Sequence, residues 1–202
     1  NGQEVIFRYE NKNYKMVIPI KGLFQIENIL CAVILSVNSG VTLKIALDAI
    51  KKIKAPKGRL MRVSSPKDNY SVYIDYAHSP DALKRVLISL RKYTKGKLVL
   101  VFGCGGDRDK GKGKQMGLIA ENYADIIYIT DDNPRNERPI EIRREILKNC
   151  NGAISIEGRK NAIYQSVKAL KKDDTLIIAG KGHEDYQEIR GHFYYLSDIE
   201  LA

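Results

Sequence analysis

The fold is decided by residues 126–135, which read IIYITDDNPR. The four apolar residues predict a buried strand, and the polar residues that follow predict a loop. In α/β sheets, ligands bind beside the carboxyl ends of the strands, so this loop is in a position to contact one. Its carboxylates, amide and guanidinium suit a ligand that carries both an ammonium and a carboxylate, such as an amino acid. An ordinary polar turn before a helix explains the same residues equally well.

Short apolar strands alternate with helical patterns on both sides of this stretch. Strands are predicted at 70–75, 97–102, 126–130, 153–156 and 175–179, and helices at 80–93, 114–123, 139–149 and 159–170. A hairpin of 187–190 and 193–196 closes over Gly191-His192. Repeated βα units imply a mostly parallel sheet that is covered by helices. The predicted fold class is therefore α/β, with a Rossmann-like domain at 67–202.

Residues 1–66 follow another pattern. Strands are expected at 5–9 and 15–20 around a turn at 11–13, followed by helices at 24–37 and 43–53. Ser64-Ser65-Pro66 resembles a linker. We expect this part to be the end of a different domain, and the chain, which begins at Asn1 and not at Met, to be a fragment of a longer protein.

Composition restricts the class of protein. The 202 residues are 44% hydrophobic, as in ordinary globular domains, and contain no apolar run near the roughly 20 residues that span a bilayer. Cys31, Cys104 and Cys150 have no paired spacing, which argues against a disulfide framework or zinc site and favours the cytoplasm. The net charge of +10 is spread along the chain, which favours a small anionic ligand over nucleic acid.

Another polar segment follows the strand at 70–75 and reads DYAHSPD, residues 75–81. Ser79 or Asp81 can cap the next helix, which needs no ligand. Capping leaves Asp75 and His78 unexplained, and a carboxylate at the end of a strand can bind ribose hydroxyls.

The loop after the strand at 97–102 reads GCGGDRDKGK, residues 103–112. Its glycines beside Arg108 favour an anion-binding loop over a merely flexible basic one. Gly113 stands where a P-loop needs Ser or Thr, and Arg108 stands where the dinucleotide fingerprint needs Gly or Ala. Neither phosphate-binding motif is therefore complete.

The last polar segment follows the strand at 175–179 and reads GKGHEDY, residues 180–186. Glu184 suits an ammonium, and the glycines leave room for a ligand. His183 has no second His or Cys nearby, so a metal role is disfavoured. Because we find no nucleophile with a partner base, the chain is predicted to bind rather than to complete a reaction.

Together these four segments, in this order, resemble the Mur ligases, in particular those that add meso-diaminopimelate. Residues 22–28 (GLFQIEN) and 58–61 (GRLM) resemble the end of that family's central ATP domain. The resemblance covers nearly the whole chain. It implies that 1–66 end the central domain and that 67–202 form a C-terminal domain that brings the incoming amino acid.

The resemblance also implies an activity. A Mur ligase of this branch uses ATP and Mg²⁺ to convert the peptide carboxylate of UDP-MurNAc-L-Ala-D-Glu to an acyl phosphate, which the amine of meso-diaminopimelate attacks. No catalytic residue and no metal ligand is expected within this chain, because the P-loop and the magnesium ligands would precede residue 1. We therefore expect a cytoplasmic monomer whose fragment alone is inactive, with no nucleic-acid or membrane partner.

The implied site residues fall into two groups. The meso-diaminopimelate site would be lined by Arg108, Asp132, Asn133, Arg135, Gly180 and Glu184, with Pro134 shaping the loop. The nucleotide would be contacted by Asn28, Arg59 and Asp75, with His78 as the least defined member.

Three alternatives remain open. A lysine-adding relative and a folylpolyglutamate-like ligase keep the chemistry but change the substrate. Lysine is disfavoured because it lacks the distal carboxylate and would leave Arg135 facing no anion. The third is a non-enzymatic module that binds a nucleotide or nucleic acid, which salt-sensitive affinity for any polyanion would reveal.

Overall fold

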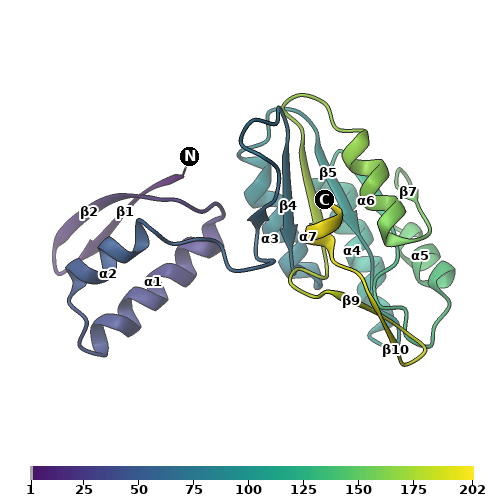
Figure 1. Ribbon diagram of the computed structural model, residues 1–202, viewed down its shortest axis with the longest axis horizontal. Coiled ribbons are helices and arrows are strands. Elements are labelled where there is room, and N and C mark those ends of the chain that lie inside the picture. The colour runs from purple at the N-terminus through teal and green to yellow at the C-terminus, as the bar shows by residue number, and fades with distance from the viewer. Residues whose placement is uncertain (1) are drawn as a thin grey trace. The chain divides into compact units, whose positions relative to one another are not determined.

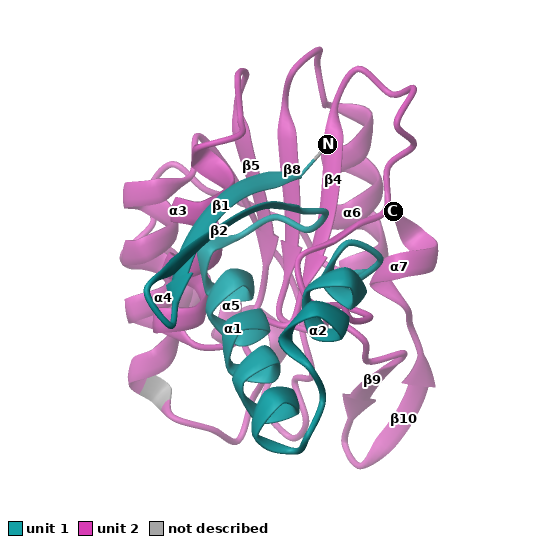
Figure 2. Cartoon of the chain, turned by 90° about the vertical axis from the view of Figure 1, so that its left-hand side faces the viewer, with its two compact units in different colours: residues 1–55 teal, residues 56–202 magenta. Residues whose placement is uncertain are grey.

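The computed structural model describes residues 2–202, except for the side chain of Lys110. The chain forms two compact units, Asn1–Ala55 and Pro56–Ala202 (Figures 1 and 2). Each unit has its own buried core, so each is described separately.

The first unit is a hairpin with two helices. Its elements are β1 (Gln3–Tyr9), β2 (Lys12–Ile18), α1 (Leu23–Asn38) and α2 (Leu43–Ile50). Glu10 and Asn11 form the turn with φ of 46° and 60°, the two-residue geometry that matches the twist of a hairpin. Because the turn takes only two residues, β2 begins at Lys12, earlier than predicted. The core is formed by Ile18, Ile20, Ile29, Val33, Ala46 and Ile50.

The second unit contains a six-stranded sheet in the order β3-β4-β8-β5-β6-β7. The strands are β3 (Met61–Arg62), β4 (Ser71–Asp75), β5 (Leu98–Phe102), β6 (Ile126–Ile129), β7 (Ile154–Ser155) and β8 (Thr175–Ala179). Only β3 runs antiparallel to its neighbour among these paired strands. The mostly parallel α/β sheet is thereby confirmed. The last strand, β8, lies between β4 and β5, with Ile178 opposite Ile74 and Ile177 opposite Leu100.

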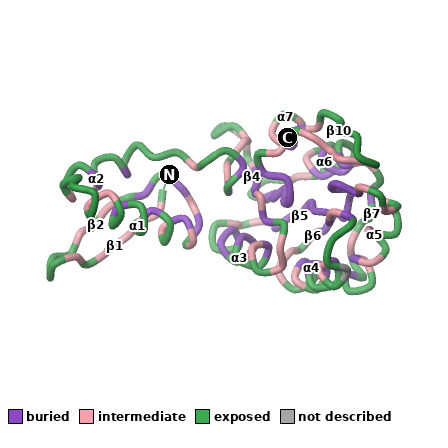
Figure 3. Tube along the Cα trace, turned by 90° about the horizontal axis from the view of Figure 1, so that it is seen from below, coloured by how far each residue is buried: buried purple, intermediate pink, exposed green. Residues whose placement is uncertain are grey.

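Helices cover both faces of this sheet. Figure 3 shows α6 (Arg159–Lys168) and α7 (Asp198–Leu201) on one face, and α3 (Pro80–Arg91) and α4 (Lys110–Tyr123) on the other. The remaining helix, α5 (Pro139–Leu147), packs beside α4. Side chains of alternate strand residues point to the same face of the sheet. Val72 and Ile74, for example, pack with Ala162 and Ile163 of α6. No helix formed by residues 2–202 has the length and apolar character needed to cross a bilayer.

The helices of the second unit begin at short polar caps. The Ser79 hydroxyl accepts a hydrogen bond of 3.4 Å from the Ala82 amide at the start of α3. Asp109 Oδ1 accepts one of 2.8 Å from the Gly111 amide. This cap starts α4 at Lys110, earlier than predicted, although the glycines at 111 and 113 are poor helix formers.

The boundary between the compact units lies at 55/56, before the boundary at 66/67 that the linker-like Ser64-Ser65-Pro66 suggested. The reason is β3, whose Met61 and Arg62 pair with Ile74 and Tyr73 of β4. Residues 56–66 therefore pack with the second unit. The assignment of 1–66 to a central ATP domain stays a prediction.

The second unit also carries a separate hairpin, β9 (Tyr186–Ile189) and β10 (His192–Tyr195). Its turn is Arg190-Gly191, with φ of 49° and 75°, one residue before the predicted Gly191-His192. Arg135 holds the hairpin to the loop after β6, since its amide donates to the Glu188 carbonyl (3.1 Å) and its carbonyl accepts from the Arg190 amide (2.9 Å).

Gly182→Ala is expected to destabilise the chain strongly. A Cβ there would lie 2.7 Å from both the Gly58 carbonyl oxygen and Tyr76 Cβ, at a φ of 56°. The matched control is Gly191→Ala, whose φ is 75° but whose Cβ would meet nothing within 4 Å. Left-handed strain alone costs about 1 kcal/mol, and the clash adds about 1–3 kcal/mol. Urea unfolding of both variants checks this, and equal losses would contradict it.

Candidate functional site

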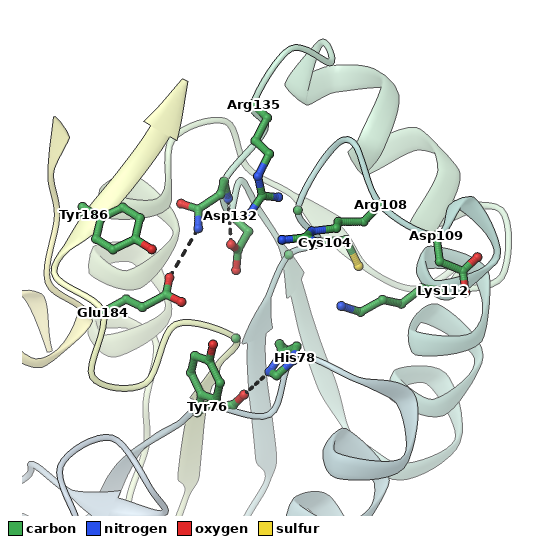
Figure 4. A pocket seen from close by; sticks show the side chains of 14 residues that line it. Tyr76, His78, Cys104, Arg108, Asp109, Lys112, Asp132, Arg135, Glu184 and Tyr186 are labelled. Carbon is green, nitrogen blue, oxygen red and sulfur yellow. Dashed lines mark hydrogen bonds between the residues drawn. The ribbon is translucent and has the colours of Figure 1, made fainter. Parts of the chain in front are cut away.

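The four polar segments meet at one edge of the sheet. They follow β4, β8, β5 and β6, which are neighbours in the sheet, so the predicted gathering of strand ends is present. A cavity of about 540 Å³ opens there, lined by Tyr76, His78, Gly103, Cys104, Gly105, Arg108, Asp109, Lys112, Asp132, Asn133, Arg135, Gly180, Glu184 and Tyr186. Figure 4 shows Glu184 and Tyr186 on one side, Arg108 and Lys112 on the other, and Asp132 between them.

The two adjacent carboxylates after β6 have different tasks. Asp131 pairs with the buried Arg143 and accepts a hydrogen bond of 2.8 Å from the Gly158 amide at the start of α6. Asp132 lines the cavity, and its Oδ1 accepts from the Asn133 amide at 2.7 Å. Only Asp132 is therefore in a position to meet a ligand in this cavity.

Arg159 holds together the segments that surround the cavity. Its Nε and Nη2 donate to the two oxygens of Asp198, each at 2.7 Å, and Nη2 also donates to the Ala179 carbonyl at 3.0 Å. Nη1 donates to the Asp131 carbonyl at 3.5 Å. All of these side-chain atoms are buried. One guanidinium thus joins the end of β8, the loop after β6 and the terminal helix α7.

Arg135 already has a counter-ion within the chain. Its Nε lies 2.9 Å from Glu188 Oε2, and its Nη1 donates to the Gly106 carbonyl at 2.9 Å. No partner of Nη2 is found among residues 2–202. In contrast to the expectation from sequence, a lysine ligand would therefore not leave this guanidinium without an anion. A ligand carboxylate would add to Glu188 rather than supply the first negative charge.

A buried network joins Asn133, Lys181 and Glu184. Lys181 Nζ donates to Asn133 Oδ1 at 3.0 Å and lies 3.2 Å from Glu184 Oε2. Asn133 Nδ2 donates to the same Glu184 oxygen at 3.3 Å. Lys181 is fully buried, and its ammonium lies 5.2 Å from the centre of the Tyr186 ring.

The glycines after β5 allow one loop to pack on another. A Cβ on Gly106 would lie 2.1 Å from the Pro134 carbonyl oxygen, and one on Gly103 would lie 2.3 Å from that of Thr130. The Gly106 amide donates to the Asn133 carbonyl at 2.9 Å. These contacts give the glycines a packing role, with Pro134 buried beneath. Arg108 is an exposed cation of this loop, and it lines the cavity.

Cys104 lines the cavity without reactive character. Burial raises the pKa of its thiol to about 12, and its Sγ lies 3.7 Å from Met116 Sδ. A thiol with so high a pKa is a poor nucleophile at neutral pH.

Asp75 supports a turn, and both of its carboxylate oxygens are used in doing so. Its Oδ2 accepts from the Leu60 amide at 2.6 Å and its Oδ1 from the Ala77 amide at 2.8 Å. Leu60 has a φ of 45°, which these contacts help to hold. Burial raises the pKa of Asp75 to about 6, while the two amides and the charge of Arg59 act in the opposite direction.

Two of the other predicted nucleotide contacts, Arg59 and His78, lie beside Tyr76. The Arg59 guanidinium lies 4.6 Å from the centre of the Tyr76 ring. The centre of the His78 ring lies 4.6 Å from the same point. Burial and the neighbouring Glu184 raise the pKa of Tyr76. Asn28 is an exposed residue of α1 in the first unit. Among the described residues, His, Cys, Asp and Glu form no group of three that could hold a metal ion.

The comparison with known families matches this geometry. Residues 58–182 fit the family described as Mur ligase, glutamate ligase domain, and this range includes all four polar segments up to Gly182. The chain belongs to the Mur ligase family. The earlier resemblance is thereby confirmed at the level of the family.

Individual Mur ligases give a finer comparison. The UDP-N-acetylmuramoyl-L-alanyl-D-glutamate--2,6-diaminopimelate ligase of Rhizobium meliloti is 49% identical over 87% of this chain, which is 36% of that protein. The chain thus spans a little over a third of this relative's length. A solved structure of a ligase of the same name is 33% identical, with a TM-score of 0.72 over 98% of this chain and 41% of that one. The MurF ligase from Thermotoga maritima in complex with ADP is 16% identical, with a TM-score of 0.64 over 87% of this chain and 41% of that one, and shares the fold.

Sequence reasoning missed part of this site. It assigned no role to Lys181, Glu188 or Arg159, and it did not place Tyr76 or Tyr186 on the cavity wall. The sequence context of Lys181 could have indicated a role in the site, since this residue stands between two glycines directly after a buried strand. Glu188 gave no such signal, because its partner Arg135 is distant in sequence.

Asp75 is expected to titrate near pH 6 in the folded chain, above its ordinary pKa of 3.8. Because folding raises this pKa, the stability that Asp75 contributes is full below its ordinary pKa and is lost as pH rises through about 6. Carbon-13 NMR of the Asp75 carboxyl checks this. A titration midpoint at or below the ordinary value of 3.8 would refute burial as the dominant cause.

Arg159→Ala is expected to destabilise the second unit by about 3–5 kcal/mol, because it leaves the buried Asp198 carboxylate unpaired. The matched control is Arg85→Ala, which removes an exposed pair with Asp81 and should cost less than about 1 kcal/mol. Chemical denaturation measures both, and similar losses would show that the Arg159 fork is not a structural support.

Proposed function

We propose that the protein containing this chain is an ATP-dependent ligase that adds meso-diaminopimelate to UDP-MurNAc-L-Ala-D-Glu. Within it, the second unit binds the incoming amino acid at the cavity beside β4, β8, β5 and β6. The observation that carries the proposal is the pairing of guanidinium and carboxylate groups in one cavity, in a chain that is 49% identical to a ligase of that name.

The cavity offers complementary groups to an amino-acid head group. Arg108 and the Nη2 atom of Arg135 suit a carboxylate, because guanidinium groups bind carboxylates through a planar fork. Asp132 and Glu184 suit an ammonium. These groups come from loops after three different strands, which the sheet places side by side.

The chemistry of such a ligase divides between two substrates. ATP transfers a phosphoryl group to the peptide carboxylate, which makes a good leaving group of the oxygen. The amine of the bound amino acid then attacks the acyl phosphate, an amide forms, and ADP and phosphate leave. The residues of this chain hold the amino acid so that its free amine faces the activated carboxylate, which is catalysis by positioning.

Several further proposals follow from the family. Residues 1–66 end the central ATP domain, and Asn28, Arg59 and His78 lie near the nucleotide, with Asp75 acting through the turn that carries Arg59. The ADP complex of a fold relative supports nucleotide binding. This chain spans 36% of the Rhizobium meliloti ligase, and the ligands of Mg²⁺ are proposed to lie mostly in the remaining part of such a ligase. The protein is proposed to be a cytoplasmic monomer.

A lysine-adding ligase is the second candidate. It is favoured by the Arg135–Glu188 pair. Because Glu188 neutralises Arg135, the site does not need a second carboxylate from the ligand. The two candidates therefore differ in how much the distal carboxylate adds to affinity.

Calorimetry with meso-diaminopimelate, L-lysine and D-glutamate tests the proposal on this chain. We expect meso-diaminopimelate to bind about tenfold more tightly than lysine, since a charge-assisted hydrogen bond contributes about 1.5–3 kcal/mol. Arg135→Ala should remove this preference. The matched control is Arg138→Ala, which removes an exposed guanidinium paired with Glu141 nearby and should preserve it.

Equal affinity for lysine and meso-diaminopimelate would move the proposal to the lysine-adding candidate. Binding of none of the three ligands would remove the second unit as an independent amino-acid site. Affinity for any polyanion that falls steeply with salt would instead indicate a nucleic-acid module.

A further inference from the structure

Lys181 is a buried cation that the proposed function has not used. Its side chain is 0% exposed, and it is not among the residues that line the cavity in the described part of the chain. Burying an ammonium is costly unless it is paired and hydrogen-bonded. A cation in such a place therefore points to a task that a smaller apolar residue could not perform.

The first partner of Lys181 is the side-chain amide of Asn133. Asn133 Oδ1 accepts from Lys181 Nζ at 3.0 Å and from the Glu188 amide at 3.1 Å. Both partners are donors, so only one orientation of the amide satisfies them. This orientation turns Nδ2 toward Glu184 Oε2, 3.3 Å away. Lys181 and the Glu188 amide thus select Nδ2 as the end of Asn133 that faces Glu184.

The second partner is the Glu184 carboxylate. Its Oε2 receives both Lys181 Nζ at 3.2 Å and Asn133 Nδ2. The carboxylate lines the cavity with a side chain that is 18% exposed. Two donors on one oxygen fix the rotation of the group, and so they fix the direction in which Oε1 points.

We infer that Lys181 is a positioning residue that sets Glu184, both directly and through Asn133, to receive the ammonium of a zwitterionic ligand. This inference rests on the proposed amino-acid site. Lys181 itself does not line the cavity; it acts through Glu184, which does. Preorganised polar groups bind a matching ligand more tightly because they need no rearrangement.

The test uses Lys181→Met, which keeps an unbranched side chain as far as Cε and removes the ammonium. The matched control is Lys112→Met, which removes a cation that lines the same cavity from α4. The first measurement needs no ligand. In nitrogen-15 NMR the Asn133 side-chain amide, assigned with Asn133→Asp, should move toward the position of a free amide in Lys181→Met and stay in place in Lys112→Met.

The second measurement is calorimetric binding of meso-diaminopimelate and of pimelate, which has the same carboxylates and no ammonium. Lys181→Met should weaken meso-diaminopimelate about tenfold, as expected for the loss of a buried hydrogen-bonding partner, and leave pimelate within about twofold. An equal loss for both ligands would mark a general structural role and overturn the inference. The double variant Lys181→Met/Glu184→Gln should bind like Glu184→Gln alone, because the effect passes through Glu184.

The two proposals fail in different ways. If the unaltered chain binds none of the amino acids, the proposed function fails, and the ligand part of this inference fails with it. If the unaltered chain binds meso-diaminopimelate and Lys181→Met binds it as well or better, only the role of Lys181 is overturned. An unchanged Asn133 resonance in Lys181→Met overturns that role regardless of any ligand.

Discussion

The fork between Arg159 and Asp198 is the interaction on which the site depends. Burial opposes a charged guanidinium, but the two hydrogen bonds to Asp198 and its charge raise the pKa of Arg159 above its ordinary value. The remaining donors reach the Ala179 and Asp131 carbonyls. These carbonyls end β8 and begin the loop after β6. The loops that form the cavity are therefore held by a buried cation that does not line the cavity, although its Nη1 lies 3.9 Å from Oδ2 of the cavity-lining Asp132.

This constraint divides the polar residues of the sheet edge into supports and ligand contacts. Both oxygens of Asp75 accept hydrogen bonds from backbone amides. Those of Asp131 bind a backbone amide and Arg143. Asp132 and Glu184 point into the cavity. Side chains of one type, close in sequence, thus have opposite tasks, because successive residues after a strand face different sides of the chain. A carboxylate at a strand end is evidence of a ligand only when it lines the cavity and its internal partners do not use both of its oxygens.

The class of fold and the four segments that line the cavity could be predicted from the sequence, because both depend on local pattern. The apolar run at 126–129 and its polar successors were enough to predict a strand and a binding loop. Two features could not be predicted. The insertion of β8 between β4 and β5 depends on packing of the whole sheet, and the pairing of Arg135 with Glu188 depends on the hairpin that returns to the loop after β6. Both are long-range contacts that leave no periodic signal.

The internal pairs also bear on which ligand the cavity suits. Arg135 is balanced by Glu188, and Glu184 by Lys181, so these two pairs are neutral before any ligand arrives. A ligand with a single charge would interact favourably with only one of these pairs and would leave the cavity with a net charge. A zwitterionic head group adds one charge of each sign, an ammonium near Asp132 and Glu184 and a carboxylate near Arg108 and Arg135. Because the cost of an unbalanced charge grows as water is excluded, this arrangement favours ligands that bring both charges together.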